Sequence, residues 1–245
     1  MTISILHETS RGRRVFPGRL FGYGITMTDV RFKNQAGQVL FGRLFFPQGD
    51  SAGLFPVVVF AHGFDSGKDS PRGMAVANRL LELGIATFLF DFTGHGESEG
   101  SKAESTIDRQ VQDLRAAVDV VSGVLGVDAS RIGVNGASSG GLVALTEAKD
   151  DARVKAISLR GPRTDGMRAY ADRFTMPVFI AQGEYDPLLD ETRGFFAALA
   201  GPKVLEVIGG ADHLFSDPTH LDEVKELTGR WFAGVFKQES REQAA

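Results

Sequence analysis

Short apolar segments that alternate with helical segments constrain the fold of this chain more than any other feature of its sequence. Residues 57–60 form such a segment, and Ser70-Pro71 after it is a pair typical of a helix start. Residues 85–90 and 131–135 lead into helical patterns in the same way, and further apolar segments follow at 154–159, 178–181 and 204–208. Strands that are apolar on both faces lie in parallel sheets with helices on both sides. The sequence therefore predicts an α/β fold with buried strands.

The two ends of the series add detail to this prediction. Residues 25–33 and 38–46 alternate polar and apolar side chains, which is typical of an antiparallel pair and brings the expected count to eight strands. A stripe of apolar residues at helical spacing predicts a helix that ends near Leu125. Asp217-Pro218 marks the start of the last helix. We expect one domain over residues 1–245, with an N-terminal extension at 1–24 and a polar tail at 237–245.

Composition excludes several classes of function. The net charge of -4 gives nucleic acid no general attraction to the surface. With no cysteine, the chain has neither a disulfide framework nor a thiolate nucleophile, and we expect no metal site and no cofactor. The apolar segments fall short of the roughly 20 residues that a membrane-spanning helix needs. Arg13-Arg14 is not followed by an apolar stretch, so we expect a cytoplasmic protein with neither a nucleic-acid nor a membrane partner. The sequence does not predict the oligomeric state.

Gly136-Ala137-Ser138-Ser139-Gly140 stands directly after one expected strand and opens a helix. A serine on such a tight turn is forced into an unfavourable backbone conformation that raises its hydroxyl above the sheet, and the flanking glycines avoid collisions. The segment therefore predicts a nucleophilic serine. Ser139 fits a looser frame of small residues, but Ser138 has glycine at both flanking positions and places the Ser139 N–H first in the helix.

A serine nucleophile needs an imidazole that takes its proton and a carboxylate that orients the imidazole. Asp186 follows the strand at 178–181, and His213 follows the strand at 204–208, so both are expected at the same edge of the sheet as Ser138. Three residues are less well placed for these roles: Glu184 is too near its strand, Asp190 is expected to cap a helix, and His220 falls inside the last helix.

The remaining candidates surround this expected triad. The loop after residues 57–60 makes the Phe64 amide a second donor, with the Ser139 amide, for a developing oxyanion. We interpret His62 as a support for that loop, and the loop that contains His95 as a brace of the site. Leu188 and Leu214 flank the acid and the base and are candidates to line an acyl pocket.

These motifs, in this order, resemble those of the α/β-hydrolase family from about residue 25 to residue 236. Within the family the chain is similar to compact bacterial carboxylesterases related to feruloyl and cinnamoyl esterases and to dienelactone hydrolases. The resemblance implies an α/β-hydrolase fold and the triad Ser138, Asp186 and His213. Dienelactone hydrolases typically carry a cysteine nucleophile, which this chain lacks. Because the stretch between the serine and the acid is short, only residues 161–176 remain for an insertion, and we expect no large cap domain.

We expect a serine hydrolase that cleaves small carboxylic esters through an acyl-enzyme intermediate. Thioester, lactone or other acyl hydrolysis by the same triad is the alternative, because the choice of leaving group depends on the shape of the pocket. A ligand-binding protein without activity on the same fold is a third possibility, although such proteins often lose a triad residue.

Overall fold

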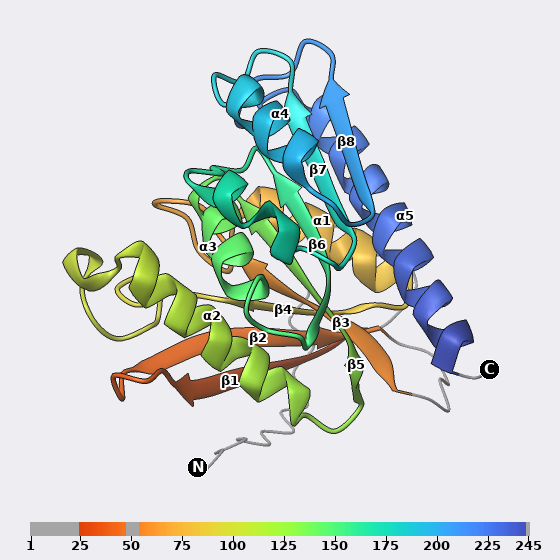
Figure 1. Ribbon diagram of the computed structural model, residues 1–245. Helices are drawn as coiled ribbons and strands as arrows, with labels where there is room; N and C mark the ends of the chain where they lie inside the picture. The colour runs from red at the N-terminus through yellow and green to blue at the C-terminus, as the bar shows by residue number, and fades with distance from the viewer. Residues whose placement is uncertain (1–24, 48–53, 244–245) are drawn as a thin grey trace.

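The computed structural model describes residues 25–47 and 54–243, with side chains up to residue 240. The expected N-terminal extension at 1–24 lies outside these residues. The chain folds into one eight-stranded sheet with the strand order β1-β2-β4-β3-β5-β6-β7-β8 (Figure 1). The strands are β1 (Thr26–Lys33), β2 (Val39–Phe46), β3 (Phe55–Ala61), β4 (Ala86–Phe90), β5 (Val127–Ala137), β6 (Val154–Arg160), β7 (Val178–Gly183) and β8 (Lys203–Ile208). The helices are α1 (Pro71–Glu82), α2 (Ile107–Ser122), α3 (Ser139–Ala148), α4 (Leu189–Ala198) and α5 (Pro218–Gln243), with short 3-10 helices η1 (Lys102–Glu104) and η2 (Met167–Arg173).

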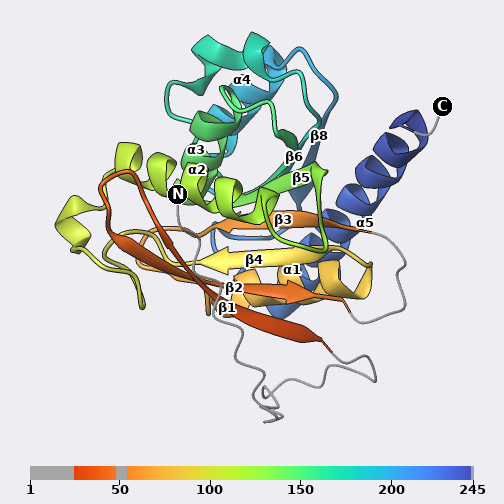
Figure 2. The same cartoon turned by 90° about the horizontal axis from the view of Figure 1, so that it is seen from below.

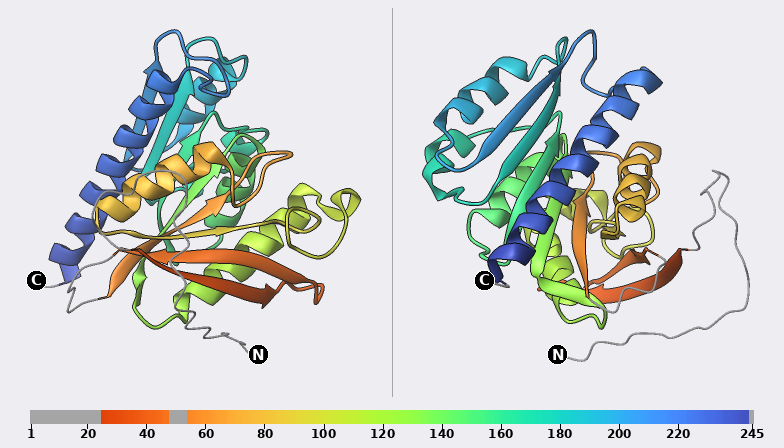
Figure 3. Two further views of the ribbon diagram at one scale, coloured as in Figure 1. Left: turned by 180° about the vertical axis from the view of Figure 1, so that it is seen from behind. Right: turned by 90° about the vertical axis from the view of Figure 1, so that its right-hand side faces the viewer.

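The sheet is largely parallel, as the sequence predicts. β1 pairs with β2, and β2 with β4, in antiparallel fashion, whereas all later neighbours are parallel. Helices α1 and α5 cover one face, and α2, α3 and α4 cover the other (Figures 1 and 3). Each face has its own apolar core because the central strands are buried on both sides. Seen from below, β1 and β2 form the edge of the sheet farthest from α4 (Figure 2).

Two helix starts follow the sequence signals, and one helix end does not. The Ser70 hydroxyl accepts the Gly73 N–H at the start of α1, with Pro71 in the first helical position. The start of α5 at Pro218 is also confirmed. Helix α2, however, ends at Ser122, and Leu125 is 94% exposed rather than part of the buried stripe. A glycine caps the helix directly after Ser122, so the chain turns before Leu125 can reach the core.

One further expectation is corrected by the structure. β8 is not a buried strand, because it is the last strand of the sheet order and exposes Val204 (39%) and Val207 (38%). Residues 237–243 of the expected polar tail continue helix α5 and are polar in sequence, so that expectation is not contradicted.

The connection between β6 and β7 contains only η2, so no cap domain covers this edge of the sheet within the described residues. In that same part of the chain no helix combines the length and the apolar character required to cross a bilayer.

Candidate active site

Ser138 stands between β5 and α3 with φ of 51°, in the left-handed region that side chains rarely adopt. Its N–H donates to the Arg160 carbonyl at the end of β6. The neighbouring glycines leave no room for a side chain, since a Cβ at Gly140 would lie 2.2 Å from the Ala61 carbonyl oxygen and one at Gly136 would lie 2.7 Å from the Gly140 oxygen. The sequence predicts this strained turn correctly, and the strain is of the kind that proteins keep at functional sites.

The structure brings the three expected side chains together. Ser138 Oγ lies 3.0 Å from His213 Nε2, and His213 Nδ1 lies 2.7 Å from Asp186 Oδ2. The Asp186 side chain is fully buried, and that of His213 is 27% exposed. They reach this point because the loops after β5, β7 and β8 leave the sheet at one edge. A carboxylate can only accept, so the His213 Nδ1 carries the proton and Nε2 is free to accept from the serine hydroxyl.

Asp186 is held by two further donors. Gln182 Nε2 donates to Oδ2 at 2.6 Å, and the Leu188 N–H donates to Oδ1 at 2.9 Å. The sequence reasoning missed Gln182, which is fully buried at the end of β7. A signal was available, since Gln182 is a long polar side chain on an otherwise apolar strand that leads directly to the expected acid.

The alternative acids and the alternative base are engaged elsewhere. Glu184 accepts the Gly210 N–H at 2.7 Å, and Asp190 pairs with Arg193 while its side chain stays 95% exposed. His220 lies on α5 beside Gly210. None of the three contacts His213 within the described residues, so the geometry favours Asp186 and His213.

Two backbone N–H groups near Ser138 have no backbone acceptor in the described part of the chain. Ser139 is the first residue of α3, where an N–H has no partner within the helix. The Phe64 N–H follows Gly63, and a Cβ at Gly63 would lie 3.4 Å from Ser138 Cβ, so this loop packs against the serine. The Phe64 ring itself is 78% exposed. Unpaired donors at such a position are what a developing oxyanion requires.

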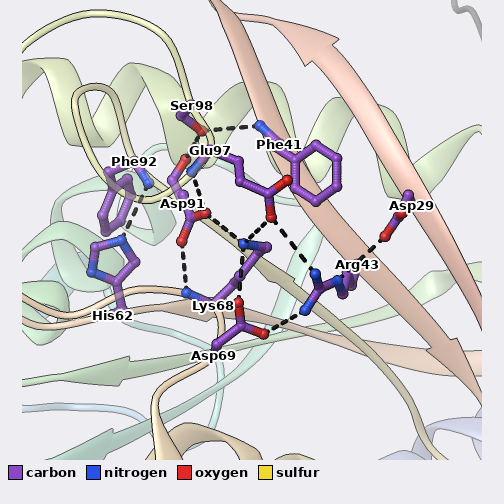
Figure 4. Close-up of polar contacts among 10 residues, drawn as sticks. All are labelled: Asp29, Phe41, Arg43, His62, Lys68, Asp69, Asp91, Phe92, Glu97 and Ser98. Carbon is purple, nitrogen blue, oxygen red and sulfur yellow. Dashed lines mark hydrogen bonds and ion pairs between the residues drawn. The ribbon is translucent and has the colours of Figure 1, made fainter. Parts of the chain in front are cut away.

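A group of charged residues centred on the buried pair Lys68 and Asp91 ties the loop after β3 to β2 and to the loop after β4 (Figure 4). The Lys68 ammonium, only 3% exposed, lies 2.9 Å from Asp91 Oδ2 and 2.7 Å from Glu97, and it also pairs with Asp69. Arg43 of β2 pairs with Asp69 in turn. Burial works to raise the pKa of Asp91, but the N–H groups of Lys68 and Glu97 and the Lys68 ammonium outweigh it and hold that pKa below its usual value. This arrangement fits the expectation that the loop after β4 braces the site.

His62 supports the same loop from the other side. The Phe92 N–H donates to His62 Nε2 at 3.2 Å, so Nδ1 carries the proton and donates to the Gly63 carbonyl at 2.9 Å. Burial lowers the pKa of His62 from 6.5 to about 4, and this effect exceeds that of the Gly63 hydrogen bond, which raises it. His62 is therefore neutral at pH 7 and fits the role of a structural support.

The pKa of His62 predicts a loss of stability in acid. Between pH 6.5 and pH 4 the unfolded chain binds a proton at His62 that the folded protein does not bind, so the free energy of unfolding falls as the pH drops. The full difference corresponds to about 3 kcal/mol. Urea unfolding at pH 7 and pH 4 should show that a His62→Gln variant, whose amide oxygen can still accept from Phe92, loses less stability on acidification than the wild type. His220→Gln is the control. If the free energy of unfolding of His62→Gln depended on pH as strongly as that of the wild type, His62 would not be the source of the stability loss in acid.

Leu188 and Leu214 lie where the sequence places them, beside the acid and the base. Leu188 is partly buried and Leu214 is 50% exposed. Their contact with an acyl group remains a prediction. No group of three or more histidine, aspartate or glutamate side chains within the described ranges is arranged to hold a metal ion.

Comparisons with known proteins agree with this fold. The family model described as serine aminopeptidase, S33, matches residues 55–170. The first curated relatives, from Mycobacterium tuberculosis, are 33% identical over 182 residues, and the chain spans 40% of their length. An uncharacterized protein of the same organism, Rv2307c, is 30% identical over 218 residues, which are 79% of this chain and 74% of that protein.

Solved structures give the same result. Est1E from Butyrivibrio proteoclasticus, a structure with bound ferulic acid, has a TM-score of 0.77 and 21% identity, and the match covers 85% of this chain and 99% of that one. Dienelactone hydrolase from Anabaena variabilis has a TM-score of 0.74 and 28% identity over 85% of this chain and 97% of that one. With its sheet order, its strained serine turn and these relatives taken together, the chain belongs to the α/β-hydrolase superfamily.

Proposed function

We propose that this protein is a serine hydrolase that cleaves small carboxylic esters through an acyl-enzyme intermediate. The observation that carries the proposal is the unbroken hydrogen-bonded path from Ser138 Oγ through the His213 ring to the buried Asp186 carboxylate, with links of 3.0 Å and 2.7 Å. No residue has to move for a proton to pass along the first link of this path.

In the first step, His213 Nε2 takes the proton of the Ser138 hydroxyl as Oγ attacks the carbonyl carbon of the ester. The carbonyl oxygen becomes an oxyanion, which the Phe64 and Ser139 amides stabilise. The tetrahedral intermediate collapses, His213 gives its proton to the leaving alcohol, and Ser138 remains acylated. Water then repeats the sequence on the acyl-enzyme, releasing the carboxylic acid and restoring the serine.

Asp186 fixes the orientation and the tautomer of His213 and stabilises the imidazolium that forms when the serine gives up its proton. The donors Gln182 and Leu188 fit this role, because they keep the carboxylate oriented towards Nδ1. Gln182 is thus a positioning residue that acts through Asp186.

No cap covers the described part of the site, which fits substrates that reach Ser138 directly from solvent, with Leu214 as an exposed apolar contact. Thioester, lactone and other acyl bonds are attacked by the same triad chemistry. A panel of acyl substrates with matched acyl groups therefore decides between the ester and its alternatives, and a protein without activity on the whole panel would support a ligand-binding role.

The nucleophile is tested by covalent labelling of the wild-type protein. A fluorophosphonate probe should modify one serine, and mass spectrometry of the digested protein should assign the adduct to Ser138, because that hydroxyl alone is hydrogen-bonded to the imidazole. Prior incubation with a slowly hydrolysed ester should protect the site. An adduct on Ser139, whose hydroxyl is buried without a partner, would move the nucleophile by one residue, and the absence of any adduct would contradict the proposal.

A further inference from the structure

A small pocket lies behind the loop that carries the Phe64 amide, on the face of the sheet that α1 covers. Its void is about 30 Å³, enough for one or two groups the size of a water molecule. Gly63 and Ala137 form part of its wall, and both are neighbours of Ser138 in space or in sequence. Arg72, from the first turn of α1, and Arg160, from the end of β6, also line it.

The two arginines lack carboxylate partners of the kind that Lys68 has. Lys68 lines the same pocket, but three carboxylates surround its ammonium. Neither Arg72 nor Arg160 has an ion pair or a side-chain hydrogen bond within the described residues, and both are only partly exposed. Burial, together with the charge of Arg72, lowers the pKa of Arg160 to about 10, so the guanidinium remains charged at pH 7.

Two unpaired cations at one pocket are unfavourable, because each loses hydration and each repels the other. An anion between them removes both costs. The guanidinium group presents paired N–H donors that match a carboxylate, and a carboxylate is of the size that this pocket admits. The first turn of α1 adds a favourable helix dipole for negative charge.

We propose that Arg72 and Arg160 bind a carboxylate group in this pocket. Arg160 and Ala137 both line the pocket, and the Arg160 carbonyl accepts the Ser138 N–H. The pocket therefore adjoins the turn that carries the nucleophile. The carboxylate has two possible sources. It belongs to the substrate itself, a half-ester of a dicarboxylic acid, in which case the inference rests on the proposed function, or it belongs to a free small carboxylic acid.

The first arm of the experiment compares matched substrates. Monoethyl esters of dicarboxylic acids from succinate to suberate are compared with ethyl esters of monocarboxylic acids of similar length, and ethanol release is followed. If the substrate supplies the carboxylate, kcat/KM should favour the half-ester at one chain length. Arg160→Met and Arg72→Gln should each reduce this preference by about tenfold or more, the range expected for a charge-assisted hydrogen bond. The result is the ratio of kcat/KM for the half-ester to kcat/KM for the monocarboxylic ester, because damage to the fold lowers both values together and leaves their ratio unchanged. Arg230→Gln, which removes an exposed charge on α5, should leave the ratio unchanged.

The second arm needs no catalysis. Sodium acetate and sodium glutarate are titrated against the wild-type protein and the three variants while the melting temperature is recorded, with sodium chloride at equal ionic strength as the reference. Stabilisation that requires both Arg72 and Arg160, without a half-ester preference, would support the site and assign it to a free carboxylate. If the protein cleaves no ester at all, the proposed function fails and this arm still decides the inference. If the wild-type protein shows no half-ester preference, and the carboxylates give no stabilisation that depends on Arg72 and Arg160, the proposed carboxylate site is overturned.

Discussion

A Ser138→Ala variant is expected to hydrolyse p-nitrophenyl butyrate about 10⁶-fold more slowly than the wild type, as measured by kcat. The variant lacks the oxygen that forms the acyl-enzyme, whereas the backbone amides of Phe64 and Ser139 remain and retain some stabilisation of the oxyanion. Alanine at a φ of 51° bears a strain similar to that of serine, so the fold should be preserved and the melting temperature should stay close to that of the wild type.

Ser216→Ala is the matched control for this measurement. Ser216 follows His213 on the same loop. Its backbone N–H, which alanine retains, donates to the exposed Asp212 carboxylate, and alanine removes only the additional bond from the Ser216 hydroxyl to that carboxylate. The control should keep wild-type kinetics. A Ser138→Ala variant that kept more than about 1% of the wild-type kcat would show that another group attacks the ester, since loss of a true nucleophile costs far more.

An Asp186→Asn variant is expected to lower kcat by about 10⁴-fold at pH 7. The amide that replaces the carboxylate can turn its NH2 group towards His213 Nδ1, which then has to accept and leaves the proton on Nε2. In that tautomer Nε2 can no longer take the proton of Ser138. The fluorophosphonate should still reach one adduct per chain, but at a much lower rate, because the nucleophile is present and its activation is lost.

The control for Asp186→Asn is Asp190→Asn, which changes an exposed acid on α4 that pairs with Arg193. It should leave both kcat and the labelling rate near those of the wild type. A large loss of kcat in Asp190→Asn together with a small one in Asp186→Asn would show that Asp190, and not Asp186, is the acid of the triad.

Local signals sufficed to predict much of the fold and the site. Strand-to-helix transitions, Ser70-Pro71 and the turn at Ser138 depend on residues close together in the chain, where backbone sterics and capping act directly. The proximity of Asp186 and His213 to Ser138 followed from a topological rule, because parallel strands end at one edge of a sheet.

The features that the sequence reasoning missed depend on contacts between distant segments. The exposure of β8 arises from its place in the strand order, which an apolar sequence does not reveal. The buried pair of Lys68 and Asp91 joins residues on two different loops, and a lysine in a loop usually lies in water. Gln182 was missed because its role is defined by the carboxylate that it meets in space.

The pairing of Lys68 with Asp91 also bears on how this protein should respond to its medium. Dissolved ions weaken attractions between charges that face water, but they reach poorly into a contact whose two side chains are 3% and 1% exposed. The loop that contains Phe64 is therefore held by an ion pair that salt screens only weakly. The position of the Phe64 amide should persist at salt concentrations that weaken surface pairs such as Lys225 with Asp222.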